Sequence, residues 1–318
     1  MSFITLILGF IFLIKGADLF VEGAASIARR FNVPSMVIGL TIVAMGTSAP
    51  EASVSVTSAL MGQNDMSVAN VVGSNLFNIL IVLGVSSLIA PLLVDKNTIK
   101  KDTPFLIIVS LMMLIFSYDL NITRIEGLLL LVVFTYFIIN TVLSAKKSAK
   151  ETNNIEIETA FDSDIVASKK VSIGKTLALC LIGIVGIVLG GDMVVDSASI
   201  IASNFGMSDN LIGLTIVAVG TSLPEFVTSV MAVKKGENDI AIGNVVGSNL
   251  FNILFILGLA STISPITISI MSFIDIIFMI FTTILLYIFM KKQNSITKTS
   301  GIIFIAIYII YLSYTIIR

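Results

Sequence analysis

Histidine is absent from this chain of 318 residues, and cysteine occurs once. Without histidine the protein lacks the commonest zinc ligand and the side chain best suited to titrate near neutral pH, so any proton chemistry must use carboxylates. The single cysteine, Cys180, lies inside an apolar run. One cysteine excludes an intrachain disulfide and a thiolate metal cluster, and we interpret Cys180 as a small buried apolar side chain.

Charge is also scarce, because only 12% of the residues are charged while 56% are hydrophobic and the mean hydropathy is +1.04. Soluble domains contain about 45–50% apolar residues. The composition therefore predicts a membrane protein. No nucleic-acid motif is visible, and we expect neither a nucleic-acid partner nor an obligate protein partner. The apolar amino terminus has no basic n-region, so we interpret it as a first membrane span and not as a signal peptide.

Apolar stretches long enough to cross a bilayer, at about 20 residues each, recur along the whole chain. They predict an all-α membrane protein with ten transmembrane helices, near residues 3–30, 33–61, 66–90, 103–119, 123–144, 173–204, 208–233, 239–264, 268–290 and 299–317.

Lysine and arginine concentrate after every second stretch, with Arg29 and Arg30 after the first and Lys234 and Lys235 after the seventh. Basic residues accumulate in cytoplasmic loops. The odd-numbered exits are therefore predicted to be cytoplasmic, with both termini outside. The hydrophilic segment 145–172 is predicted to be a cytoplasmic linker, and we assign it no chemistry.

The two halves of the chain repeat each other. IGLTIVAMGTSAPE at 38–51 matches IGLTIVAVGTSLPE at 212–225, and NVVGSNLFNIL at 70–80 recurs at 244–254. Each half contains five predicted spans, which is an odd number, so the second half must enter the membrane from the opposite side. The sequence thus predicts two inverted-topology five-helix repeats, 1–144 and 173–318.

Both GTSxPE blocks place a proline, Pro50 or Pro224, inside an apolar stretch. Proline removes a backbone donor and clashes with the preceding turn, so we expect the helices to break at 46–50 and 220–224, at the membrane midplane. Freed carbonyls at that depth need a polar partner such as a bound ion. The blocks also supply hydroxyls and a carboxylate each, namely Thr47, Ser48, Glu51, Thr221, Ser222 and Glu225.

The repeated NVVGSNLFN blocks add further polar side chains. Ser74 and Asn78 are four residues apart, as are Ser248 and Asn252, so on a helix each pair shares one face and can point into one cavity. Gly73 and Gly247 permit close helix approach. Asn70, Asn75, Asn244 and Asn249 belong to the same blocks.

An ionised carboxylate at the bilayer centre costs about 2.5 kcal/mol or more, so a symmetric pair of buried glutamates indicates function. Oxygen ligands suit hard ions such as Na⁺, Ca²⁺ and Mg²⁺. Two carboxylates give the site a charge near −2, which one divalent or two monovalent cations would neutralise. Competition between these loads for one site is what counter-transport requires.

The paired GTSxPE and GSNLFN motifs resemble the alpha repeats of the cation/calcium antiporter superfamily, specifically the prokaryotic sodium/calcium exchanger family, over nearly the whole chain. The resemblance implies a plasma-membrane antiporter that uses the sodium gradient to export Ca²⁺ by alternating access, with more than two Na⁺ per Ca²⁺ and no cofactor beyond the transported ions. It also implies that the first and sixth helices slide across the rest, which matches glycine-rich runs at 16–23 and 183–191. The implied ion cage comprises Glu51, Glu225, Thr47, Ser48, Thr221, Ser222, Ala44, Ala218, Ser74, Asn78, Ser248 and Asn252.

Other functions remain open at this point. A Ca²⁺/H⁺ antiporter of the same fold could use Glu51 and Glu225 as proton carriers, although proton-coupled relatives usually show GNATE-like repeats. An ion channel could also use intramembrane carboxylates, but inverted repeats favour alternating access. An enzyme is disfavoured, because no histidine, activated cysteine or nucleotide-binding glycine loop accompanies the carboxylates. Potassium-dependent relatives carry aspartate at the position of Asn252, so the amide favours potassium independence.

Overall fold

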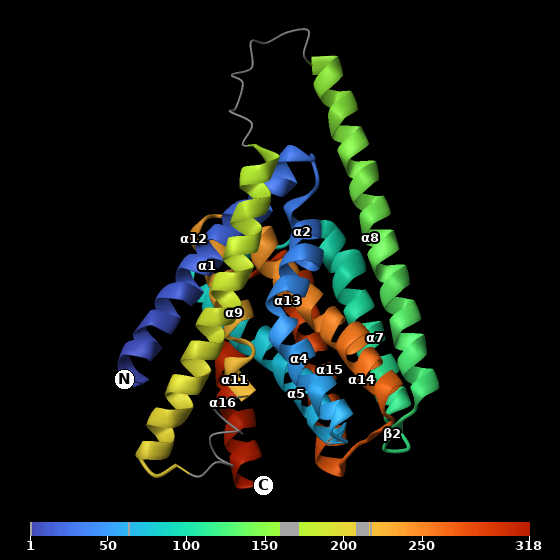
Figure 1. Cartoon of the computed structure of the whole chain (residues 1–318). Helices are drawn as coiled ribbons and strands as arrows, with labels where there is room; N and C mark the ends of the chain where they lie inside the picture. Colours follow the sequence, from blue (N-terminus) through green and yellow to red (C-terminus); the bar gives the residue numbers. More distant parts are fainter. Residues whose placement is uncertain (1, 63, 160–171, 208–215, 217) are drawn as a thin grey trace.

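The computed structural model describes residues 2–62, 64–159, 172–207, 216 and 218–318, and these residues form an almost entirely helical protein (Figure 1). The elements of the first half are α1 (Ser2–Arg30), α2 (Ser35–Ile38), η1 (Gly39–Val43), α3 (Ala44–Thr47), α4 (Ala49–Leu60), α5 (Asn64–Phe77), η2 (Asn78–Val82), α6 (Leu83–Ile89), β1 (Leu92–Leu93), η3 (Thr98–Asp102), α7 (Thr103–Phe116), β2 (Asn121–Ile122) and α8 (Arg124–Thr159). Those of the second half are α9 (Ile173–Asn204), α11 (Ala218–Gly220), α12 (Leu223–Lys234), α13 (Asn238–Phe251), η5 (Asn252–Leu257), α14 (Gly258–Ile263), β3 (Ile266–Thr267), α15 (Ile270–Gln293), β4 (Ser295–Ile296) and α16 (Lys298–Ile317).

The prediction of an all-α membrane protein is confirmed. In the described part of the chain, seven helices are long and apolar enough to cross a bilayer, and a bent pair, 35–47 with 49–60, makes an eighth. The count of ten stays a prediction, because the stretch 208–233 begins among residues outside the described ones, and the helix formed by η3 and α7 is not among these spans. η3 leads directly into α7, and the charged residues Lys100, Lys101 and Asp102 lie at this junction.

The helix that contains the fifth predicted span is much longer than its apolar stretch. The apolar span covers 124–147, close to the predicted 123–144, but α8 continues from Arg124 to Thr159, so part of the segment predicted to be a linker prolongs this helix (Figure 1). Hydropathy marks only the apolar part of a helix, which explains the difference. Residues 160–171 lie outside the described part of the chain.

Both predicted helix breaks are present. α3 and α4 meet at Ser48, where the chain bends by 50°. Ser222 precedes α12 in the same way, with similar backbone angles of φ −90° and ψ 4°. Pro50 and Pro224 each lie in the first two positions of the new helix. Proline is tolerated there because the first helical N–H groups have no intrahelical partner, so the same residue that ends one helix starts the next.

α1 and α9 pack closely against each other along their lengths and run in opposite directions (Figure 1). Glycine makes the approach possible. A Cβ on Gly16 would lie 2.6 Å from the backbone nitrogen of Ile187, and one on Gly190 would lie 2.4 Å from that of Leu13. The glycine-rich runs therefore serve first to join the first and sixth predicted helices to one another.

Two short β-ladders tie the halves together. β1 pairs with β4, and β2 pairs with β3, both antiparallel. A shift of 174 residues, the separation of equivalent positions in the two motifs, carries β1 onto β3 and β2 onto β4. The two ladders are thus equivalent contacts, and each is formed by one strand from the first half and one strand from the second half.

The centre of the molecule is formed by the helices that carry the NVVGSNLFN blocks. Of the apolar window across α13, η5 and α14, 94% is buried, against 17% of the window in α16. Gly247 permits one of the tight contacts at this centre, since a Cβ there would lie 2.5 Å from the carbonyl oxygen of Leu40. The block in the second half therefore packs directly on the broken helix of the first half.

Candidate functional site

Glu51 and Glu225 occupy equivalent positions, each in the first turn of the helix that follows a break. Both side chains are completely buried. The first turn of a helix favours a carboxylate, because unpaired N–H groups and the helix dipole both present positive charge there. The breaks in the two helices therefore give each glutamate a place that partly offsets the cost of burial.

Each glutamate is held by a hydroxyl from the other half of the chain. The Ser48 hydroxyl donates to Glu225 Oε1 at 2.6 Å, and the Ser222 hydroxyl donates to Glu51 Oε1 at 3.0 Å. The two breaks consequently face one another. The two copies of the repeated motif therefore form one site, in which each contact has an equivalent related by an approximate twofold arrangement.

Serines from the NVVGSNLFN blocks join the same group. The Ser74 hydroxyl lies 3.4 Å from Glu51 Oε1, and the Ser248 hydroxyl lies 3.5 Å from Glu225 Oε1. The Ser222 hydroxyl also lies 3.0 Å from Ser74 Oγ. Both blocks thus reach the glutamate of their own half, as the shared helix face predicted.

Several buried oxygens of the predicted cage have no hydrogen-bond partner among the described residues. They are Glu51 Oε2, Glu225 Oε2, Asn78 Oδ1, Asn252 Oδ1 and Thr221 Oγ1. Buried acceptors without a donor are rare and costly. A cation bound among them would satisfy these oxygens. Carboxylate, amide and hydroxyl oxygens are ligands for hard ions such as Na⁺ and Ca²⁺.

The remaining residues of the predicted cage differ in what they contact. The Thr47 hydroxyl is bonded to the carbonyl of Val43, 3.1 Å away, and to Asn244 Oδ1, also at 3.1 Å. The Ala44 carbonyl lies 3.5 Å from the Ser248 hydroxyl. Ala218 is the first residue of α11. The Thr47 hydroxyl therefore contacts a backbone carbonyl and an asparagine of the other half, whereas the predicted serine hydroxyls contact the glutamates.

Two asparagines that were not assigned to the cage bind the backbone of its two glutamates. Asn70 Nδ2 donates to the carbonyl of Glu51 at 3.2 Å, and Asn244 Nδ2 donates to the carbonyl of Glu225 at 3.3 Å. The first residue of each repeated block therefore fixes the backbone that carries the glutamate. Its recurrence in both halves was the available signal.

The part of the chain that the structure describes has no group of three or more Asp, Glu, Cys or His side chains arranged to hold a metal ion. The site instead joins two carboxylates to neutral oxygens. Such a set gives a charge near −2 without fixing one ion, which suits a site that must both bind and release its load.

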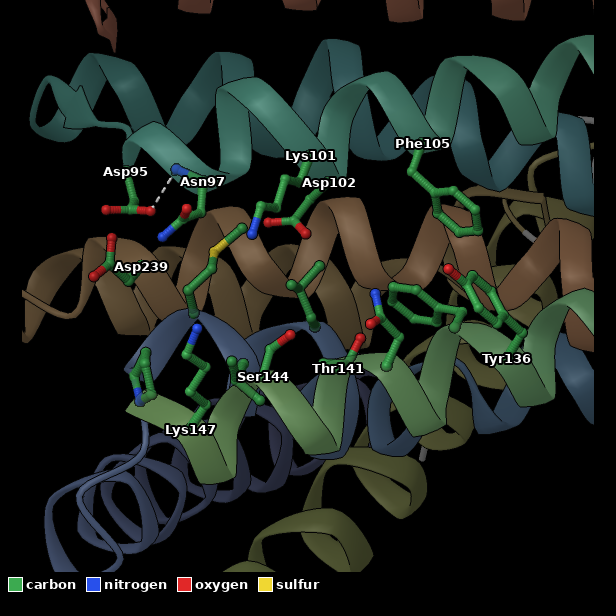
Figure 2. Close-up of a pocket in the computed structure, with 16 residues that line it drawn as sticks. Asp95, Asn97, Lys101, Asp102, Phe105, Tyr136, Thr141, Ser144, Lys147 and Asp239 are labelled. Atoms are coloured by element: carbon green, nitrogen blue, oxygen red, sulfur yellow. Dashed lines mark hydrogen bonds between the residues drawn. The ribbon is translucent and has the colours of Figure 1, made fainter. Parts of the chain in front are cut away.

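A separate cavity of about 670 Å³ lies between α2, η3, α7, α8 and α13 (Figure 2). Phe105 and Tyr136 line one end of it, while Asp95, Asp102 and Asp239 lie toward the other, from three different segments. None of the residues that line this cavity belongs to the predicted cage. Burial and the neighbouring Asp95 raise the pKa of Asp102 to about 6.

The raised pKa of Asp102 leads to a stability prediction. The folded protein disfavours the ionised carboxylate, so this group destabilises the fold once the pH exceeds its unfolded pKa of about 3.9. Asp102→Asn is expected to raise the melting temperature at pH 8, for a gain of at most about 3 kcal/mol. The gain should shrink as the pH falls through 6 and disappear near 4. Thermal unfolding in detergent across this pH range measures it, and a constant difference at every pH would exclude the electrostatic cause.

The family model for sodium/calcium exchanger protein matches residues 1–143 and 175–317. The putative antiporter CaxA of Alkalimonas amylolytica is 43% identical over 82% of this chain and 81% of its own length. The sodium/calcium exchanger MaX1 of Methanosarcina acetivorans is 30% identical over 98% of this chain and 97% of its own.

A solved structure of the sodium-calcium exchanger NCX_Mj is similar to this fold, with a TM-score of 0.85 and 33% identity over 99% of this chain and 98% of that one. The family match covers both halves and leaves out only the segment between them. It therefore includes both broken helices and all the residues that bring the buried oxygens together. The chain belongs to the sodium/calcium exchanger protein family.

Proposed function

We propose that this protein is a secondary active antiporter that exchanges Na⁺ for Ca²⁺ by alternating access, with the ions bound between Glu51 and Glu225. The observation that carries the proposal is the pair of buried glutamates at the meeting point of the two broken helices, each with one carboxylate oxygen that has no hydrogen-bond donor. The proposed ligands are Glu51, Glu225, Ser48, Thr47, Thr221, Ser222, Ala44, Ala218, Ser74, Asn78, Ser248 and Asn252.

The orientation and location belong to the same proposal. The alternation of basic and neutral loops supports cytoplasmic odd-numbered exits and both termini outside. The plasma-membrane location is proposed from membership of the exchanger family. The domains would then be two inverted repeats, 1–144 and 173–318, with the segment 145–172 on the cytoplasmic side. The opposite directions of α1 and α9, the first helix of each half, agree with an inverted arrangement.

Charge balance gives the mechanism. With both carboxylates ionised, one Ca²⁺ or at least two Na⁺ would neutralise the site, so the two loads compete for the same oxygens. A bound cation offsets the free-energy cost of burying two negative charges. The protein can then change between its outward-open and inward-open states at low free-energy cost only when the site is occupied. Obligate exchange follows from that requirement.

The test is uptake of labelled Ca²⁺ into proteoliposomes that hold the purified protein. Vesicles loaded with NaCl are expected to accumulate Ca²⁺, while vesicles loaded with choline chloride should stay at the level of protein-free vesicles. A pH gradient without sodium separates the proton-coupled alternative. Equal uptake from choline-loaded vesicles, or uptake driven by protons alone, would contradict sodium coupling.

A further inference from the structure

Four asparagines form a closed network between the two halves, next to the buried glutamates. Asn75 and Asn249 donate from their side-chain nitrogens to each other's backbone carbonyl, both at 3.3 Å. Each then accepts through its side-chain oxygen from a partner in the opposite half. Asn78 Nδ2 donates to Asn249 Oδ1 at 3.1 Å, and Asn252 Nδ2 donates to Asn75 Oδ1 at 3.0 Å.

The network determines which end of two amides faces the ion site. An asparagine amide has one end that accepts hydrogen bonds and one that donates them. The side-chain NH₂ groups of Asn78 and Asn252 donate to Asn249 and Asn75, respectively. Their acceptor ends, Oδ1, are the ones left buried without a donor. Reversing either amide would point hydrogens toward a cation and bring two acceptor oxygens together.

We propose that Asn75 and Asn249 are positioning residues that hold the amide oxygens of Asn252 and Asn78 toward the bound ion. They act through these two amides. The inference rests on the proposed function, because it requires Asn78 and Asn252 to be ligands. It also concerns specificity, since an acceptor at Oδ1 of Asn75 or Asn249 favours a neutral amide over an ionised carboxylate opposite it. The network thereby keeps the charge of the site to that of the glutamate pair.

The two copies of the network are not equally strong. Asn252 Nδ2 also donates to Ser74 Oγ at 3.1 Å, so it keeps one acceptor if Asn75 is removed. For Asn78, the hydrogen bond to Asn249 is what fixes the amide. The substitution Asn249→Ala is therefore expected to have the larger effect on ion binding.

The test is a double-mutant cycle read out as the half-saturating Ca²⁺ concentration for sodium-driven uptake. Asn249→Ala is expected to raise it by about 10- to 100-fold, the usual cost of losing a group that orients a metal ligand. In the Asn78→Asp background the same change should cost no more than about twofold, because a carboxylate presents oxygen at both ends and has no amide to orient. Equal losses in the two backgrounds would overturn the proposal.

Further variants distinguish the loss of amide positioning from a general loss of folding. Asn249→Asp keeps the acceptor for Asn78 but loses the donor to the Asn75 carbonyl, so it is expected to lose less Ca²⁺ affinity than Asn249→Ala. A loss as severe as in Asn249→Ala would count against positioning. Ser110→Ala removes another buried hydroxyl, which donates to the carbonyl of Leu106 within α7, and should leave the half-saturating concentration unchanged. If Asn249→Ala does not fold, the cycle of Asn75→Ala with Asn252→Asp asks the same question.

The control for the underlying site is Asn78→Ala. Unchanged Ca²⁺ affinity in that variant would show that Asn78 is no ligand, which refutes this part of the proposed site whatever Asn249 does. Reduced affinity in Asn78→Ala, together with additive losses in the cycle, would leave the site standing and reject the positioning role alone.

Discussion

Sodium-driven Ca²⁺ uptake is expected to fall to background when Glu51 or Glu225 is replaced by glutamine. The substitution keeps the shape of the side chain and removes half the charge of the site. Loss of one partner from a buried charged group costs about 3–5 kcal/mol, which corresponds to a loss of at least about 100-fold in affinity for the cation. Uptake into sodium-loaded proteoliposomes, at several Ca²⁺ concentrations, measures the effect.

Stability and a matched control separate this loss from misfolding. Glu51→Gln removes one of two buried carboxylates, so its melting temperature without ions should equal or exceed that of the wild type. Glu126→Gln is the control. Glu126 accepts from the backbone and hydroxyl of Thr123 at the start of α8, a capping contact that glutamine can also make. Normal uptake by Glu51→Gln or Glu225→Gln would contradict the proposed site.

Separation of α1 from α9 is the expected result of the conservative substitution Gly190→Ala. The new methyl group would lie 2.4 Å from the backbone nitrogen of Leu13 and 2.7 Å from the carbonyl oxygen of Gly9, so the helices must move apart. Overpacking of this kind costs about 1–3 kcal/mol. If α1 and α9 move together during transport, Gly190→Ala should also lose transport activity, because the two helices would no longer be packed against each other.

Cys180 provides a direct measurement of that separation. It is the only cysteine of the chain and is buried, and a Cβ on Gly23 of α1 would lie 2.6 Å from its sulfur. A thiol-reactive dye should therefore label Gly190→Ala faster than the wild type. Gly174→Ala, near the start of the same helix, adds a methyl group whose one neighbour within 4 Å among the described residues is Ser172 Oγ, at 3.9 Å, and it should label at the wild-type rate. Equal labelling of the two variants would reject the packing argument.

The sequence predicted the parts of the site that depend on local physics. Pro50 and Pro224 broke their helices where expected, because the cause lies within the proline itself. Ser74 and Ser248 reached the glutamates because their spacing places them on one helix face. The hydrogen bonds from Ser48 to Glu225 and from Ser222 to Glu51 are equivalent because the two halves carry the same sequence motif.

Features that depend on tertiary contacts could not be predicted in this way. Which end of the Asn78 amide is left without a partner is decided by Asn249, and no local pattern encodes that choice. The cavity with Asp95, Asp102 and Asp239 combines segments far apart in the chain. The length of α8 was missed because its end is polar, and hydropathy alone cannot distinguish a polar helix from a loop.

Anomalous diffraction from crystals soaked in Ca²⁺, recorded at long wavelength, tests the central claim most directly. The expected result is a peak between the two broken helices, about 2.3–2.6 Å from carboxylate oxygens of both Glu51 and Glu225. Soaking with a large excess of Na⁺ should remove that peak. No peak at this position in crystals that bind Ca²⁺ elsewhere, for example beside Asp95 and Asp239, would contradict the proposal that the paired glutamates hold the transported ion.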